Sequence, residues 1–347
     1  PSSNLSNASC VVYLQTLGGA MLSQGGCSNS FIDPVTLPYS GEYQLAIMPN
    51  PCCPGTLSLN LITVPNDITI STSIGSTVNV PQNAPGQNVY LTFSAASGQK
   101  VSLSMANQTY PNTYPSSCGI SLTNSAGNSL AGGNCNPGSN YIDTVSLSDP
   151  GTAIYTILVN PAGAATGSMT LTINNTNDLV VNGLSIDGAV IPVSSSTPGQ
   201  NIILPFPSSM ANERIVVYAS NITVQSALGY VLESDEKTAL PQYLQLNNNV
   251  PGTVFFLDTQ SLGAVGTYYL DVVHQGSYVG GEGLQVASVP PDATGTVTIN
   301  GSALPVQITA AGQNADITFA GTQGQFVTVH AANSNISSCG MWVYPQG

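Results

Sequence analysis

Residues 86–96 read GQNVYLTFSAA, a glycine-containing turn followed by a run in which apolar and polar residues alternate. The tripeptide Gly-Gln-Asn returns at Gly199 and Gly312, and its spacing is constant, since 199 − 86 = 113 and 312 − 199 = 113. A fixed spacing of one sequence pattern is the signature of tandem structural modules. The sequence therefore predicts an array of similar modules with a repeat of about 113 residues.

Three further landmarks keep their order around this tripeptide. A glycine opens a strand in each copy at Gly41, Gly151 and Gly266. A second alternating run follows at 57–61, 169–173 and, more weakly, 284–286. An aspartate precedes a new β run at Asp67, Asp178 and Asp292. We therefore expect the C-terminal half of a module at 1–65, complete modules at 66–176 and 177–290, and the N-terminal half of another at 291–347.

The strand pattern predicts an all-β protein made of Ig-like or jelly-roll-like sandwiches. Alternating runs recur throughout, for example at 101–105, 155–159, 268–272 and 326–330. Clusters of Gly, Pro, Asn and Asp separate them at intervals of about 8 to 12 residues, as in β-sandwiches. Apart from a short turn near 208–213, no segment shows apolar residues at helical spacing over three turns. Each module should hold roughly seven to nine strands.

Cysteine spacing predicts one disulfide in each of two modules. Cys10 and Cys27 have the same spacing as Cys118 and Cys135, since 27 − 10 = 17 and 135 − 118 = 17. The pairs occupy equivalent positions, because 118 − 10 = 108. Zinc is the rival interpretation, but its paired ligands are usually separated by two to four residues. Disulfides imply an oxidising, extracellular environment. The module at 177–290 lacks the equivalent cysteine pair, which would begin around Leu228.

Three cysteines lie outside this scheme. Cys52 and Cys53 occupy a Pro- and Gly-rich turn and are compatible with a vicinal disulfide, a link to another chain or two free thiols. Cys339 is the first cysteine of a further copy, and its partner would lie outside the chain or in a neighbouring molecule.

The composition excludes several classes of function. Three basic residues stand against 16 acidic ones, and the net charge is −13. Nucleic acids and anionic membranes are disfavoured, because binding to either relies on clustered Lys and Arg. No apolar stretch is long enough for a membrane span.

No residue pattern indicates catalysis, a metal or a cofactor. His274 and His330 lie at strand ends. We expect the side chain of each to be either exposed to solvent or accommodated within a core. The acidic run 233–236 lacks the order of a calcium loop and is expected to be a solvated hairpin tip beside Lys237. We therefore expect no enzyme activity.

Glycans are the one small ligand class that the sequence suggests. Trp342, Tyr110, Tyr114 and Tyr141 could stack on sugars, although most tyrosines fall at alternating core positions. Asn-x-Ser/Thr sequons are candidate glycosylation sites; they occur at Asn4, Asn7, Asn107, Asn174, Asn221, Asn300 and Asn335.

A family resemblance accompanies the repeat. The stretches GQKVSLSM at 98–105 and ISLTNSAGNSL at 120–130, with a later glycine-led strand pair, resemble bacterial pre-peptidase C-terminal-type β-sandwich repeats. The likeness is best at 84–173 and weakest at 177–290. It implies display on extracellular or surface proteins and transfers no catalytic residue.

These observations favour a structural subunit or segment of an extracellular filament, such as a pilus-like filament, surface stalk or adhesin shaft. The expected partners are copies of the same chain, joined head to tail. Two explanations fit the half-modules: the chain is a window on a longer polypeptide, which the duplicated cysteine strand favours, or neighbouring molecules complete each other's modules. The alternative function is a set of non-catalytic modules that bind carbohydrate or protein.

Overall fold

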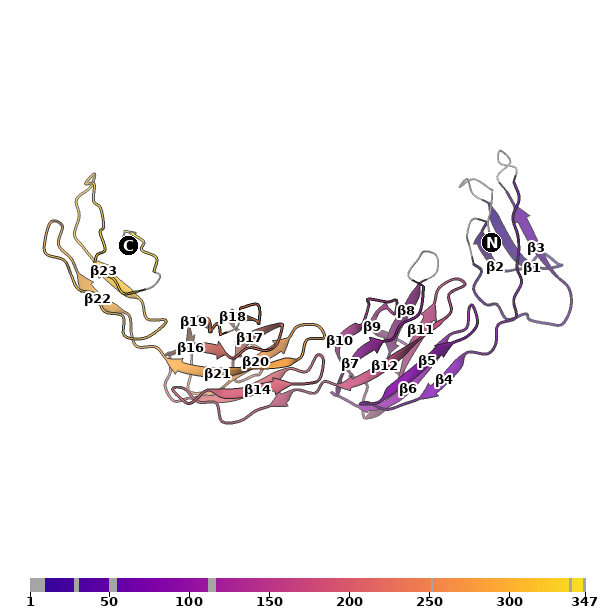
Figure 1. Ribbon diagram of the computed structural model, residues 1–347, viewed down its shortest axis with the longest axis horizontal. Helices are drawn as coiled ribbons and strands as arrows, with labels where there is room; N and C mark the ends of the chain where they lie inside the picture. The colour runs from indigo at the N-terminus through magenta and orange to yellow at the C-terminus, as the bar shows by residue number, and fades with distance from the viewer. Residues whose placement is uncertain are drawn as a thin grey trace.

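The protein is built from β-strands that follow one another along an elongated molecule. The computed structural model describes residues 10–27, 31–49, 55–111, 117–250, 252–336 and 339–345, and these contain strands but no helix. In Figure 1 the chain runs from β1–β3 at one end, through two sandwiches, to β22 and β23 at the other end. The predicted all-β sandwich fold is confirmed.

The first sandwich comprises β4 to β12. Its strands are β4 (Ile68–Ser71), β5 (Thr77–Gln82), β6 (Val89–Ala96), β7 (Lys100–Ala106), β8 (Cys118–Thr123), β9 (Ser129–Asn134), β10 (Tyr141–Ser146), β11 (Thr152–Pro161) and β12 (Gly167–Asn175). One sheet has the order β4-β6-β11-β8-β9 and the other β10-β7-β12-β5. All neighbours are antiparallel except β4 and β6, which are parallel.

The second sandwich repeats this topology in β13 to β21. Its strands are β13 (Leu179–Val180), β14 (Ile191–Ser195), β15 (Ile202–Ser208), β16 (Glu213–Ser220), β17 (Ser226–Leu232), β18 (Ala239–Asn247), β19 (Phe255–Leu262), β20 (Gly266–His274) and β21 (Gly280–Ser288). The sheets are β13-β15-β20-β17-β18 and β14-β21-β16-β19. Each strand therefore has a counterpart nine places earlier, and β13 pairs in parallel with β15 as β4 does with β6.

Each sandwich has its own apolar core between its two sheets. In the first, Leu91, Ile157 and Leu171 alternate inward from three strands and are fully buried. The expected alternation arises because successive side chains of a strand point to opposite faces. Two separate cores make the sandwiches independent packing units.

An aromatic pair marks the same register in both sandwiches. Phe93 of β6 lies opposite Tyr155 of β11, with ring centroids 5.8 Å apart. Phe206 of β15 lies opposite Tyr268 of β20, at 6.1 Å. Both rings of the pair keep the repeat period, since 206 − 93 = 113 and 268 − 155 = 113. Large rings at these central positions contribute much of the buried apolar area.

The two ends carry fewer strands. The N-terminal unit, residues 10–64, contains β1 (Val11–Thr16), β2 (Met21–Gly26) and β3 (Tyr43–Met48) in the order β2-β1-β3. The C-terminal unit, residues 292–345, contains β22 (Ala293–Thr296) and β23 (Ala315–Thr318), which pair in parallel.

Two expected strands do not form in these end units. The runs 57–61 and 326–330 alternate in sequence but lie outside any named strand. A strand is stabilised by hydrogen bonds to neighbours on the sheet. The counterparts of these runs in the first sandwich, β12 and β7, pair with each other. The two runs lie at opposite ends of the chain (Figure 1) and cannot pair within one molecule.

Candidate functional site: the junctions between units

Each Gly-Gln-Asn tripeptide forms a tight turn where two units meet. The amide of Gln87 donates to the carbonyl of Ala84, and the same bond joins Gln200 to Thr197. Gly86 and Gly199 hold φ angles of 79° and 83°. Proline and then a left-handed glycine at the two central positions are typical of a type II turn. The third copy keeps the turn, with Gly312 at φ 78°.

The glutamine of each turn binds the chain entering the unit. The side-chain amide of Gln87 donates to the carbonyl of Asn66 at 2.7 Å. Gln200 does the same to Asn177 at 3.0 Å, and Gln313 to Pro291 at 2.7 Å. The connecting segment is therefore tied to the turn in all three copies.

The glycine of each later turn contacts the preceding unit directly. Thr144 of β10 donates its hydroxyl to the carbonyl of Gly199 at 2.8 Å. The counterpart Thr259 of β19 donates to Gly312 at 2.7 Å. A Cβ atom on Gly199 would collide with the hydroxyl of Tyr141, and one on Gly312 would lie 2.5 Å from Thr259 Oγ1. These two junctions leave room for glycine only.

An ion pair spans each junction that follows a complete sandwich. Lys100 Nζ lies 2.7 Å from Asp178 Oδ2, and Arg214 binds Asp292 at 2.8 Å. All four side chains are about a quarter to a third exposed. The pairs are equivalent in the repeat, since 214 − 100 = 114 for the basic residues and 292 − 178 = 114 for the acidic ones. Two of the three basic residues in the chain are therefore used at equivalent places.

The same junctions shift the pKa values of two carboxyl groups. The backbone amide of Asn314 and then the guanidinium of Arg214 lower the pKa of Asp292. Burial raises the pKa of Asp271 to about 6, and the charge of Asp178 adds to this while Lys100 opposes it. One oxygen of Asp271 is buried without a hydrogen-bond partner. The surroundings of Asp271, beside the first ion pair, thus disfavour the ionised form of its carboxyl group.

Sequence reasoning missed these ion pairs. A partial signal lay in the spacing, because Lys100 and Arg214 are 114 residues apart, one more than the 113-residue repeat, in a chain with only three basic residues.

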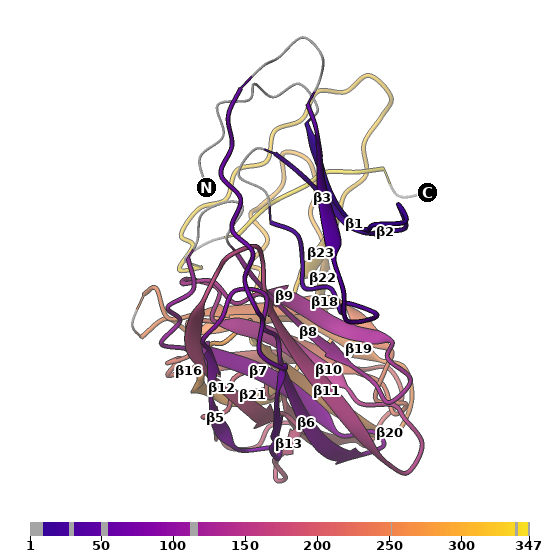
Figure 2. The same cartoon turned by 90° about the vertical axis from the view of Figure 1, so that its right-hand side faces the viewer.

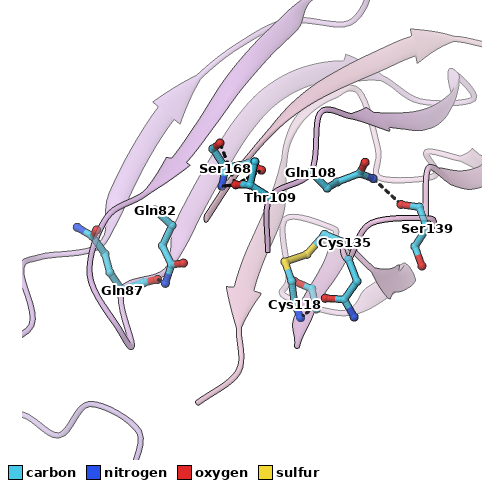
Figure 3. The surroundings of a disulfide bond; sticks show 10 residues. Gln82, Gln87, Gln108, Thr109, Cys118, Cys135, Ser139 and Ser168 are labelled. Atoms are coloured by element: carbon cyan, nitrogen blue, oxygen red, sulfur yellow. Dashed lines mark hydrogen bonds between the residues drawn. A yellow bond between two sulfur atoms is a disulfide. The ribbon is translucent and has the colours of Figure 1, made fainter. Parts of the chain in front are cut away.

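Both predicted disulfides are present. Cys10 is bonded to Cys27, and Cys118 to Cys135. Figure 3 shows the second bond joining β8 to the residue that follows β9, close to the Gln108–Ser139 hydrogen bond. Cys339 is free and exposed, whereas Cys52 and Cys53 lie outside the described residues. These bonds are suited to an oxidising environment.

Apolar side chains replace the disulfide in the second sandwich. Ala227 of β17 lies opposite Leu246 of β18 where Cys118 and Cys135 face each other, and both are fully buried. Nearby, His274 is buried with its Nε2 3.6 Å from Glu282 Oε2. His274 therefore belongs to the core, whereas His330 is exposed.

The acidic run 233–236 forms the tip of the β17–β18 hairpin. Hydrogen bonds from the Thr238 hydroxyl and from the amides of Thr238 and Lys237 lower the pKa of Asp235 to about 2. The carboxylate is thus used to close the turn. Across the described ranges, no group of three or more His, Cys, Asp or Glu could share a metal ion.

The aromatic candidates for sugar stacking do not gather on one face. Tyr110 is buried, and burial raises its pKa to about 12. Tyr141 is half-buried at the junction, and Trp342 is exposed in the C-terminal unit. Tyr114 lies outside the described residues.

The sequons differ in their accessibility. Asn107, Asn221, Asn300 and Asn335 are exposed, while Asn4 and Asn7 lie outside the described residues. Asn174 is half-buried, and its amide nitrogen donates to the hydroxyls of Ser102 and Ser104. A glycan on Asn174 would replace a hydrogen on the nitrogen that makes both bonds, so this sequon is the least suited to modification.

Comparisons with known proteins give no family. No family model and no curated protein matches the chain. Similar solved structures include the CUB1-EGF-CUB2 domains of rat MASP-1, at 7% identity and a TM-score of 0.20, over 62% of this chain and 99% of that chain. The CUB1-EGF-CUB2 domain of human MASP-1/3 aligns at 7% identity and a TM-score of 0.19, over 61% and 99%. The resemblance to pre-peptidase C-terminal-type repeats stays a prediction.

Within the part of the chain that the structure describes, no helix has the length and apolarity to cross a bilayer.

Proposed function

We propose that the chain is a structural subunit or segment of an extracellular filament or surface stalk. The observation that carries this proposal is the repeated junction, in which the same turn, glutamine, threonine contact and ion pair recur from one unit to the next. A binding protein needs one well-formed recognition site. A rod needs the same joint repeated, because its length and direction depend on every joint.

The distribution of charge supports this role. Lys100 and Arg214 are both engaged in ion pairs, so Lys237 at a hairpin tip is the one basic side chain outside a junction. With only three basic residues, the shaft offers few sites to proteases that cleave after Lys or Arg. Disulfides add stability outside the cell, at the cell surface or beyond it.

Electron microscopy of the native material, combined with the mass of the denatured chain under non-reducing conditions, tests the proposal. Uniform filaments or stalks whose thickness matches one sandwich are expected. Dispersed particles of a single chain that bind a glycan saturably would contradict the proposal and favour the non-catalytic binding module.

A further inference from the structure

The N-terminal unit has an open sheet edge. Its sheet β2-β1-β3 corresponds to β9-β8-β11 of the first sandwich, and the Cys10–Cys27 bond corresponds to Cys118–Cys135. In the first sandwich, β11 is flanked by β8 on one side and β6 on the other. Among the described residues, β3 has β1 on one side and no strand on the other.

A tyrosine contact supports this correspondence. The hydroxyl of Tyr43 of β3 accepts a hydrogen bond from the backbone amide of Tyr39. In the first sandwich the hydroxyl of Tyr155 of β11 accepts one from the backbone amide of Asp149. The place of β3 in its sheet is therefore that of β11.

Core positions of this unit are exposed. The apolar side chains of Leu45, Ile47, Leu59 and Leu61 are 37%, 41%, 49% and 82% exposed. Their counterparts one repeat later are all 0% exposed; they are Ile157, Val159, Leu171 and Ile173. Contiguous apolar residues left open to water mark an interaction surface. The unit therefore presents half of a sandwich core without its other half.

The C-terminal unit presents the complementary half. Its parallel pair β22-β23 corresponds to β4-β6 and β13-β15. Val306, Val327 and Val329 are 44%, 45% and 56% exposed. Their counterparts in the second sandwich are buried; they are Val193, Ile215 and Val217. This unit thus supplies the positions of β4 to β7, which the N-terminal unit lacks.

We infer that the C-terminal unit of one molecule docks on the N-terminal unit of a second copy and completes a sandwich, with β23 pairing antiparallel to the free edge of β3. The inference rests on the proposed function and adds the joint between subunits. The completed sheet would have the order β22-β23-β3-β1-β2, which reproduces β4-β6-β11-β8-β9.

The two complete sandwiches specify the register of this joint. Phe93 lies opposite Tyr155, and Phe206 opposite Tyr268. Phe319 takes the place of Phe206 in the next repeat, since 319 − 206 = 113. Phe319 of one copy should therefore lie opposite Tyr43 of the next. The same register places Thr318 opposite Gln44 and Ile317 opposite Leu45.

A second copy is the occupant that fits both exposed surfaces. The two units lie at opposite ends of the elongated molecule in Figure 1, so they cannot meet within one chain. A contact between two different surfaces of identical molecules repeats without closing and makes a filament. Residues 339–345 repeat the β1 pattern, but β1 already holds its place through the Cys10–Cys27 bond. They therefore stay outside the completed sheet.

A cysteine pair tests the register between copies. All chains carry Cys339→Ser, and one chain with Gln44→Cys is mixed with another carrying Thr318→Cys. Oxidation should join the two chains, and mass spectrometry of peptic fragments should find the 44–318 link. The matched control uses Asp316→Cys, which the register places opposite Ala46, and it should link several-fold less. Equal linking in both mixtures, or none in either, would overturn the inference.

A charge on the docking surface tests the contact without cysteines. Leu45→Lys places an ammonium group where the completed core would be dry, and burial of an unpaired charge is strongly unfavourable. Subunits should then sediment as single chains. Ile154→Lys is the control, because Ile154 is 61% exposed on a complete sandwich. Circular dichroism establishes that both variants fold.

The outcomes separate the two proposals. Filaments that persist with Leu45→Lys would refute this joint and leave the filament function standing, with units completed within one longer polypeptide. Native material that contains no filaments would refute the proposed function itself.

Discussion

Gly199 meets two constraints at once, one from its backbone conformation and one from the preceding sandwich. Its φ of 83° lies in the left-handed region, and a Cβ atom there would meet Tyr141 and Thr144 of the preceding sandwich. A side chain would strain the backbone and push the two sandwiches apart at once. Both constraints recur at Gly312, which gives a physical reason for the tripeptide to recur in a chain whose modules otherwise differ.

Substitution of Gly199 should therefore loosen the junction. Gly199→Ala is expected to cost about 1 kcal/mol through its backbone and to widen the distribution of molecular lengths seen by small-angle X-ray scattering. Gly75→Ala is the matched control, because Gly75 has a φ of 86° and open space around it. The control should lower the melting temperature without changing the scattering. Identical scattering for both variants would show that the contact is unimportant.

Asp271 predicts an unusual dependence of stability on pH. Burial raises its pKa to about 6, above the value of about 3.9 expected in the unfolded chain. Between these values the folded state holds a proton that the unfolded chain has released, so the contribution of Asp271 to the free energy of unfolding falls as pH rises from about 4 to about 6.

Removing this carboxylate should stabilise the protein near neutral pH. Asp271→Asn is expected to raise the free energy of unfolding at pH 7 by about 1–3 kcal/mol, with little change at pH 4. Denaturant melts at both pH values measure the free energy of unfolding. Glu42→Gln is the control, because Glu42 is exposed. An equal effect at the two pH values would contradict the assignment.

At the scale of elements, the disulfide joins β8 to the end of β9 in one sandwich while its counterpart uses apolar contact. A closed loop of about 15 residues stabilises a domain by about 3 kcal/mol, mainly by restricting the unfolded chain. Here the sequence separation of Cys118 and Cys135 is 17. The second sandwich holds Ala227 and Leu246 at the same place.

The two sandwiches should therefore respond differently to loss of the bond. Replacing Cys118 and Cys135 by serine is expected to lower the melting transition of the first sandwich by several degrees and leave that of the second unchanged. Differential scanning calorimetry resolves the two transitions. Replacing Ala227 by Ser is the reciprocal control. A common downward shift would mean that the sandwiches unfold as one unit.

At the scale of the whole molecule, the two ion pairs tie neighbouring units together at their junctions. Partly exposed pairs contribute modestly to stability, up to about 1 kcal/mol each. Their larger effect is on geometry, because each joins the first residues of one unit to a strand of the preceding one. Figure 2 looks along the long axis of the molecule, and the two sandwiches overlap in this view. Small changes at the two joints would therefore alter the overall length.

Removing both pairs should make the rod more flexible. Lys100→Met with Arg214→Met is expected to broaden the distance distribution between spin labels in the two sandwiches, while the melting temperature changes by a few degrees at most. Lys237→Met, at a hairpin tip, is the control. High salt should weaken the wild-type joint in the same direction, because screening acts on exposed pairs. An unchanged distance distribution would show that the turns alone hold the joint.

The sequence by itself determined the all-β class, the tandem order and both disulfides. These features depend on local alternation and on fixed spacings, which can be read without knowing what lies nearby. The equal spacing of Cys10–Cys27 and Cys118–Cys135, for example, predicts one disulfide in each of two modules.

The tertiary structure alone decided which residues meet across a junction. Lys100 and Asp178 are far apart in the chain, and only the folding of β7 beside the entry to β13 brings them together. It also decided which alternating runs become strands: among the described residues, 57–61 and 326–330 carry the pattern but lie outside every named strand. Alternation specifies the face a side chain takes, whereas hydrogen bonding to a neighbour decides whether a strand exists.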